Sequence, residues 1–97
     1  MGGHGLSMKS VATSRFWKAF EKLPAAIQRR ARQRYLRWRR DPADPALHFK
    51  KAGGWWCVRV DQGYRAVGYL KGETMHWDWI GDHDGYEEFL RERRVTD

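Results

Sequence analysis

Apolar residues recur at two different spacings along this chain. In the first half they return every three or four positions, the period of one helical face: Phe16, Phe20 and Leu23, then Ile27, Ala31, Tyr35 and Trp38. After position 53 the pattern changes to short runs rich in aromatic and β-branched residues, separated by glycine-containing turns. Such runs are typical of antiparallel strands. The sequence therefore predicts helices first and most of a sheet afterwards.

The two predicted helices have recognisable ends. Ser14 can accept a hydrogen bond from the first free N–H groups of a helix, and Leu23-Pro24 interrupts that helix. Pro24 suits the first turn of a second helix. We expect the second helix to run to about Arg39 and to end at Asp41-Pro42, because a residue before proline avoids helical angles.

The strands are expected at residues 6–13, 55–60, 64–70 and 74–80, with extended chain between residues 47 and 51. Gly63 and Gly72 lie in the turns between the last three strands. After Gly81 a short helix is expected, because Asp84 and Glu87 have the spacing of a capping box.

The element order β-α-α-β-β-β-α predicts an α+β fold. Two N-terminal helices would pack on one face of a small, twisted, antiparallel-rich sheet, and a short helix would close the chain. We expect residues 8–97 to form one domain and residues 1–7 to be a flexible lead-in.

The large apolar side chains are not all easy to place. Three tryptophans are expected in the core: Trp17, Trp38 and Trp56. Strand alternation leaves open which of three others is exposed: Trp55, Trp77 and Trp79. Leu36 is an apolar residue among the arginines of the second helix, a position suited to an apolar anchor from a partner helix.

Composition adds a partner class and a setting. The formal net charge is +7, from 19 Lys and Arg against 12 Asp and Glu, which favours nucleic acid or another polyanion. Arg37 and Arg40 of the second helix are candidates for RNA contact, and a solvated helix face is the alternative. The single cysteine, Cys57, excludes an internal disulfide and fits a cytoplasmic location. No apolar run approaches the roughly 20 residues that cross a bilayer.

Arg59 and Arg65 lie inside two predicted strands. Burying an unpaired charge costs several kcal/mol, so both must line an open face or a cleft. Phosphate is the natural anion for guanidinium groups in a basic chain. For Arg65 the alternative is an ion pair with one of three carboxylates: Asp61, Asp78 or Asp82.

The Gly81-Asp82-His83 turn supplies the best titrating candidate. The imidazole of His83 can serve as base or acid. A backbone-bonded or Asp82-bonded histidine is the alternative. We expect His48 to be structural or to face solvent.

The order of motifs resembles that of the RelE/ParE toxin superfamily of bacterial toxin–antitoxin modules. The resemblance covers the chain from about Met8 to Leu90 and rests on these pieces: the helix ending at Leu23-Pro24, the basic helix ending at Asp41-Pro42, Leu47-x-x-Lys50, Trp56-x-Val58-Arg59-Val60, Gly63-Tyr64-Arg65-Ala66, Trp79-Ile80-Gly81-Asp82-His83, and Tyr86. It implies a small twisted sheet with two N-terminal helices. Many members cleave mRNA in the ribosomal decoding site without a metal, and others poison DNA gyrase.

The resemblance also implies roles for individual residues. Arg65 would meet the scissile phosphate with Arg59, and His83 would act as acid or base. Lys50 or Lys51 would lie beside the active cleft, with Lys50 supporting the developing charge and Lys51 contacting RNA, and two solvated loop lysines are the alternative. Tyr86 would orient phosphate or stack on a base, and a packing role is its alternative.

The implied partners are the ribosome, mRNA and a cognate antitoxin. No cofactor and no metal site is expected, because the loose set of His76-x-Asp78 with Asp82-His83-Asp84 matches no known zinc spacing. The expected function is that of a ribosome-dependent mRNA endonuclease toxin. The alternatives are a non-catalytic toxin acting on gyrase and an inactive RNA-binding relative.

Overall fold

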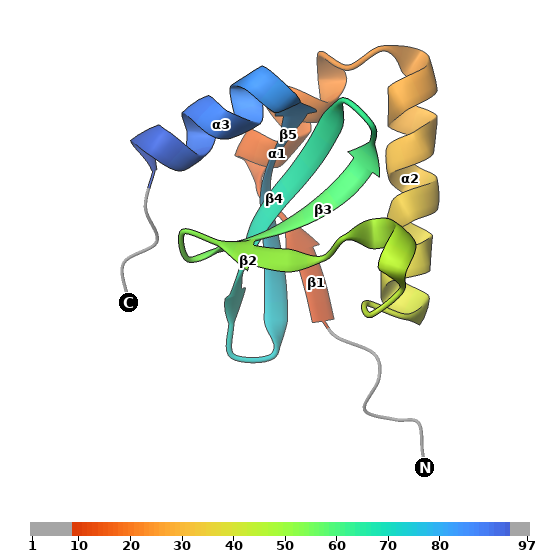
Figure 1. The fold of residues 1–97 in the computed structure, drawn as a ribbon, viewed down its shortest axis with the longest axis vertical. Coiled ribbons are helices and arrows are strands. Elements are labelled where there is room, and N and C mark those ends of the chain that lie inside the picture. Colours follow the sequence, from red (N-terminus) through yellow and green to blue (C-terminus); the bar gives the residue numbers. More distant parts are fainter. Residues whose placement is uncertain (1–8, 94–97) are drawn as a thin grey trace.

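The computed structural model describes residues 9–93 (Figure 1). The elements follow in the order β1 (Lys9–Ala12), α1 (Ser14–Glu21), α2 (Ala25–Arg40), a 3-10 turn (Pro45–Leu47), β2 (Lys50–Ala52), β3 (Trp55–Asp61), β4 (Tyr64–Lys71), β5 (Thr74–Asp82) and α3 (His83–Glu92). Among these residues, no helix has the length and apolar character needed to cross a membrane. The expected lead-in at residues 1–7 lies outside the described residues.

The five strands form one sheet in the order β1-β5-β4-β3-β2. Strand β1 runs parallel to β5, and the other neighbours are antiparallel. The α+β class is confirmed, with one more strand than expected, so the order is β-α-α-β-β-β-β-α. The extra strand is β2, where Lys50 and Ala52 pair with Cys57 and Trp55 of the neighbouring strand. A strand of three residues is too short to show an alternating pattern in the sequence.

The helix caps differ from the predicted ones by one or two residues. Thr13, and not Ser14, accepts the N–H of Phe16 at the start of α1. Asp82, and not the Asp84 and Glu87 pair, accepts the N–H of Gly85 at the start of α3. In both places the residue directly before the helix has an extended backbone and a polar side chain. The oxygen of that side chain acts as the cap.

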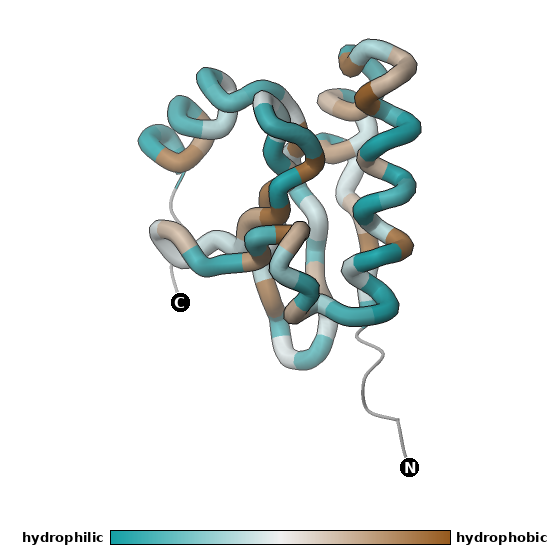
Figure 2. Tube along the Cα trace, turned by 45° about the vertical axis from the view of Figure 1, so that its right-hand side comes forward, coloured by the Kyte–Doolittle hydropathy of each residue, from teal (hydrophilic) through white to brown (hydrophobic). Residues whose placement is uncertain are grey.

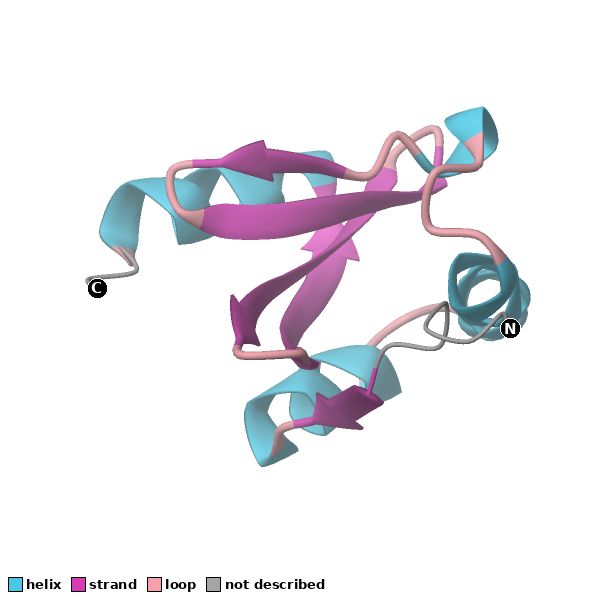
Figure 3. Ribbon diagram, turned by 90° about the horizontal axis from the view of Figure 1, so that it is seen from below, coloured by secondary structure: helices cyan, strands magenta, loops and turns pink. Residues whose placement is uncertain are grey.

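The sheet is covered on both faces, and each face has its own core. On one face α1 and α2 pack on the sheet, with Phe20, Trp38, Val60, Trp77 and Ile80 among the buried residues. On the other face α3 packs through Phe89 onto Trp55, Cys57 and Val67. Figure 3 shows α2 viewed along its axis at one end of the twisted sheet and α3 at the other. The expected helical pair on one face is confirmed.

The tryptophans divide unevenly between core and surface. Trp38 is buried as expected, and Trp55 and Trp77 are also buried. The expectation for Trp17 is wrong, because its side chain is 49% exposed. Its ring packs edge-on against Phe16 and Phe20 of the same helix, so only one side of the indole is covered. Trp56 is only partly buried, against Phe49.

A bulge in β5 fixes α1 to the sheet. Val67 pairs with Trp79 and Gly68 with Trp77, which leaves Asp78 outside the ladder. Asp78 is 7% exposed, and its carboxylate accepts hydrogen bonds from Thr13 Oγ1 at 2.9 Å and from Arg15 Nη1 at 3.2 Å. Since Thr13 also caps α1, one hydroxyl joins the start of the helix to strand β5.

We predict that Thr13→Val lowers the free energy of unfolding by about 2 kcal/mol, because it removes the cap and one hydrogen bond to a buried carboxylate while keeping the side-chain shape. Urea unfolding measures the change. Thr74→Val is the matched control, since Thr74 makes no side-chain hydrogen bond within residues 9–93. Equal stability of the two variants would contradict the role assigned to Asp78.

Candidate functional site

The turn between β3 and β4 holds the guanidinium group of Arg65. Its Nη1 donates to the carbonyl oxygens of Asp61 at 2.9 Å, Gln62 at 3.2 Å and Tyr64 at 2.9 Å. These carbonyls are neutral, so they fix the group in place and leave its charge uncompensated. The β3–β4 register also sets Arg59 directly opposite Arg65. Like charges facing each other across strands are unfavourable unless an anion joins them.

The carboxylates that could have neutralised Arg65 are engaged elsewhere. Asp61 pairs with Arg30 of α2 at 3.3 Å, and Asp78 pairs with Arg15. Asp82 caps α3 through Gly85. Within residues 9–93 the ion-pair alternative for Arg65 is therefore wrong. None of these three carboxylates neutralises the positive charge of Arg65.

His83 is brought to the same turn from β5. The ring of Trp79 lies against Gly81, where a Cβ atom would come within 2.4 Å of the indole. This close approach explains the glycine of the Gly81-Asp82-His83 turn. The backbone N–H of His83 donates to Gly63 O at 3.0 Å, which ties the start of α3 to the β3–β4 turn. The imidazole is about half exposed, and its Nδ1 lies 3.9 Å from the Glu87 carboxylate.

These side chains line one small pocket on the α3 side of the sheet, with a volume of about 120 Å³. Its walls are His48, Lys50, Cys57, Val58, Arg59, Arg65, His83 and Tyr86. All four residues expected to act in chemistry are thus neighbours: Lys50, Arg59, Arg65 and His83. Tyr86 is there too. His48 was not predicted as part of this site. It directly follows a 3-10 turn, and so short a turn has no periodic pattern of apolar residues.

The groups behind the pocket keep their protons at neutral pH. Burial, with a smaller contribution from the adjacent Cys57 thiol, raises the pKa of the Tyr86 phenol to about 12. Burial also raises the pKa of the Cys57 thiol. Tyr86 can therefore donate a hydrogen bond but is not a base, and Cys57 is a packing residue and not a thiolate nucleophile.

Three residues expected to contact RNA lie outside this pocket. Lys51 pairs with Trp56, one position along β2 from Lys50, so strand alternation turns its side chain away. Arg37 binds Asp44 through a 2.7 Å contact. The donors Ala46 N–H and Arg37 keep the pKa of Asp44 below its ordinary value. Arg40 is exposed at the end of α2.

The loose set of possible metal ligands is not assembled. Asp78 is bound to Thr13 and Arg15, and His76 stacks on Tyr69 with 4.9 Å between ring centroids. Among residues 9–93 no group of three His, Cys, Asp or Glu side chains lies in a position to hold a metal ion.

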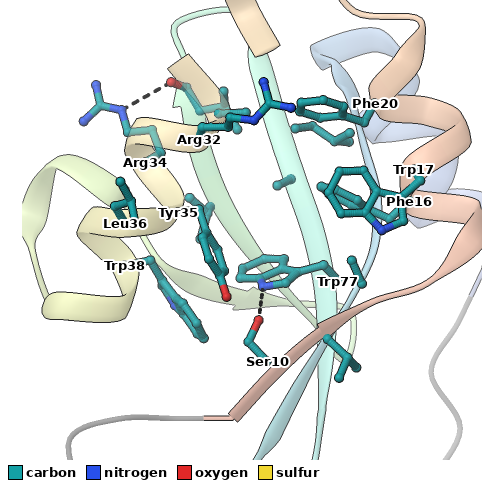
Figure 4. A pocket seen from close by; sticks show the side chains of 17 residues that line it. Ser10, Phe16, Trp17, Phe20, Arg32, Arg34, Tyr35, Leu36, Trp38 and Trp77 are labelled. Carbon is teal, nitrogen blue, oxygen red and sulfur yellow. Dashed lines mark hydrogen bonds between the residues drawn. The ribbon is translucent and has the colours of Figure 1, made fainter. Parts of the chain in front are cut away.

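A larger groove of about 520 Å³ opens on the opposite face, between α1 and α2 (Figure 4). Helix α1 contributes Phe16, Trp17 and Phe20, and α2 contributes Tyr35 and Leu36. The floor comes from the sheet and includes Trp77, whose indole N–H donates to Ser10.

The groove is apolar inside and basic at its edge. Leu36 is 63% exposed, the expected anomaly on a helix that Figure 2 shows as mostly hydrophilic. The Arg32 guanidinium lies 5.0 Å from the centre of the Phe20 ring and closes one end between the two helices. Arg34 Nε donates to Val60 O, so this arginine packs along the groove wall.

Comparison with known proteins gives similarity in structure only. No family model matches the chain, and no curated protein matches it in sequence. The RelB-RelE antitoxin–toxin complex from Methanococcus jannaschii superposes with a TM-score of 0.66 at 14% identity, over 81% of this chain and 96% of that chain.

Two other solved structures agree with this result. The YoeB/ParE toxin from Agrobacterium tumefaciens has a TM-score of 0.62 and 19% identity, over 78% of this chain and 99% of that chain. The isolated E. coli RelE toxin has a TM-score of 0.59 and 15% identity, over 89% and 98%. The chain therefore has the fold of the RelE/ParE toxins.

Proposed function

We propose that this protein is the toxin of a toxin–antitoxin system and that it cleaves mRNA on the ribosome in the cytoplasm. The observation that carries the proposal is the small cationic pocket. It sets Arg59 and Arg65 opposite each other, next to His83, while the nearby carboxylates are bound to other groups. A phosphodiester fits this arrangement because it is an anion with two unesterified oxygens.

In this mechanism the guanidinium groups hold the scissile phosphate. Arg65 is already fixed by three carbonyl oxygens, so it need not reorganise as charge builds up on the phosphoryl oxygens. Lys50 stands on the neighbouring strand and adds positive charge to the same oxygens. His83 transfers a proton at the edge of the pocket, where half of its imidazole is open to substrate.

Tyr86 has a more limited role in this reaction. With its pKa raised to about 12 it stays a neutral phenol, so it donates a hydrogen bond to phosphate or packs against the base. Arg40 and Lys51 lie outside the pocket and bind the phosphates of ribosomal RNA or mRNA. Arg37 also contacts RNA, but its guanidinium group is already paired with Asp44.

The partner proposed for the apolar groove is an antitoxin segment that forms an acidic amphipathic helix. The groove offers aromatic walls and the exposed Leu36, and its edge carries Arg32 and Arg34 on a chain of net charge +7. An amphipathic helix buries its apolar face in such a groove and places its acidic side chains against the arginines. The antitoxin–toxin complex cited above shares this fold.

We predict that Arg65→Ala and His83→Ala each slow mRNA cleavage by about 100-fold or more, because each removes a group that acts on the transition state. The assay uses ribosomes programmed with a defined mRNA, with mapping of the new 5′ ends. Arg91→Ala, on the exposed part of α3, is the control. Intact transcripts combined with DNA breaks would point instead to a gyrase poison, and retained RNA affinity without either effect to an inactive relative.

Tyr86 gives a prediction on pH. Its folded pKa of about 12 exceeds the ordinary value of 10.0, so its contribution to stability is full below about pH 10 and is lost as the pH rises toward 12. Tyr86→Phe should remove this part of the alkaline loss and the last phenolate step of an ultraviolet titration. A final step unchanged in Tyr86→Phe would show that the phenol is not buried.

The groove is tested with Leu36→Glu. We expect its affinity for the antitoxin encoded by the neighbouring reading frame to fall about 30-fold, or about 2 kcal/mol, because a charge replaces an apolar anchor. mRNA cleavage by the free protein should not change. Leu70→Glu is the matched control, since Leu70 is also exposed but lies outside the groove. Equal affinities of both variants would move the docking site elsewhere.

A further inference from the structure

The cationic pocket contains a second imidazole, that of His48. The residue before it, Leu47, is completely buried, and the residue after it, Phe49, stacks on Trp56 with ring centroids 4.7 Å apart. Two packed neighbours therefore hold His48 at a fixed place while its own side chain stays exposed. The backbone of His48 has φ 47°, a left-handed conformation that is uncommon for residues other than glycine. The packing on both sides maintains this conformation.

The contact of His48 with Arg59 shows which nitrogen points inward. Arg59 Nη1 lies 3.4 Å from His48 Nε2. A guanidinium group can only donate, so this contact is a hydrogen bond when Nε2 carries no proton. In the tautomer that carries its proton on Nδ1, His48 Nε2 accepts from Arg59 and has the lone pair that a general base requires.

His83, which lines the same pocket, has the opposite arrangement. Its Nδ1 faces the carboxylate of Glu87 at 3.9 Å. When the ring is protonated, Nδ1 points its proton at this carboxylate and Nε2 carries a second proton that it can give away. The two imidazoles therefore differ in their neighbours, a cation for His48 and an anion for His83.

We propose that His48 is a second catalytic residue, the general base, and that His83 is the general acid. The assignment rests on the proposed cleavage of RNA. When Arg59 donates to the phosphate in place of His48, the lone pair of His48 Nε2 is free to take the proton of the 2′-hydroxyl, and the 2′-oxygen forms a bond to phosphorus. The bond from phosphorus to the 5′-oxygen then breaks, and that oxygen takes the proton of His83. The products are a 2′,3′-cyclic phosphate and a 5′-hydroxyl, and exchange of protons with water resets both rings.

Every element around the pocket contributes a group that faces these rings. Lys50 comes from β2, Arg59 and Cys57 from β3, Arg65 from β4, and Tyr86 with the nearby Glu87 from α3. The cations bind the phosphate between the two imidazoles. Tyr86 and Cys57 keep their protons and do not compete as bases.

The test separates proton transfer by His48 from positioning of Arg59. Glutamine offers an oxygen that still accepts from Arg59 but cannot take a proton at neutral pH. We expect His48→Gln to cleave ribosome-bound mRNA about 100-fold more slowly than the wild type in single-turnover assays. The wild type should show a bell-shaped pH profile. His48→Gln should lose the acidic limb and His83→Ala the alkaline limb.

His76→Gln is the matched control, because His76 stacks on Tyr69 away from the pocket. Added imidazole should restore part of the activity of His48→Ala. Wild-type rate and pH profile in His48→Gln would overturn the assignment of His48 and leave the proposed nuclease intact. A wild-type protein that cleaves no mRNA at any pH would overturn the nuclease proposal itself and the His48 assignment with it.

Discussion

The candidate site depends on hydrogen bonds to the backbone carbonyl oxygens of the β3–β4 turn. Those of Asp61, Gln62 and Tyr64 hold the Arg65 guanidinium, and that of Gly63 accepts the N–H of His83. One tight turn thus positions a cation from β4 and the first residue of α3. Because the acceptors are neutral, the turn supplies rigidity and leaves the positive charge available to an anion.

The two faces of the sheet differ in chemical character. The α3 face carries charged and titrating groups around a pocket of about 120 Å³, and the opposite face carries an apolar groove of about 520 Å³ between α1 and α2. Facing arginines weaken the sheet locally. The cores on both faces, with Trp38 and Ile80 on one and Phe89 on the other, compensate for this repulsion.

Much of this organisation could be predicted from the sequence, since α2, β3, β4 and β5 are long enough to show a clear helical or strand pattern of apolar residues. Arg59 and Arg65 could be grouped because a charged residue inside a strand must reach an open face or a cleft. His83 was added to them through the family resemblance of the Gly81-Asp82-His83 turn. Local geometry was harder to predict. The cap of α1 depends on Asp78 in the β5 bulge, which accepts a hydrogen bond from Thr13, 65 positions away in the sequence. The three-residue strand β2 and the 3-10 turn that places His48 have no period to detect.

Trp17 shows a related limit of pattern reading. Helical spacing assigns a residue to a stripe but does not say how wide the covered part of the helix is. In α1 the sheet covers Phe20 while half of the Trp17 side chain stays open beside the groove. A helix that packs near the edge of a sheet buries a narrower stripe than its apolar residues suggest.

Strand β5 belongs to both faces at once. Trp77 lies in the floor of the groove, the next residue anchors α1, and the same strand ends at the imidazole of His83. Amino-acid changes along this strand therefore affect both the groove and the cationic pocket. A substitution that moves Trp77 also shifts the strand that ends at His83, so the groove and the cationic pocket cannot be altered independently through β5.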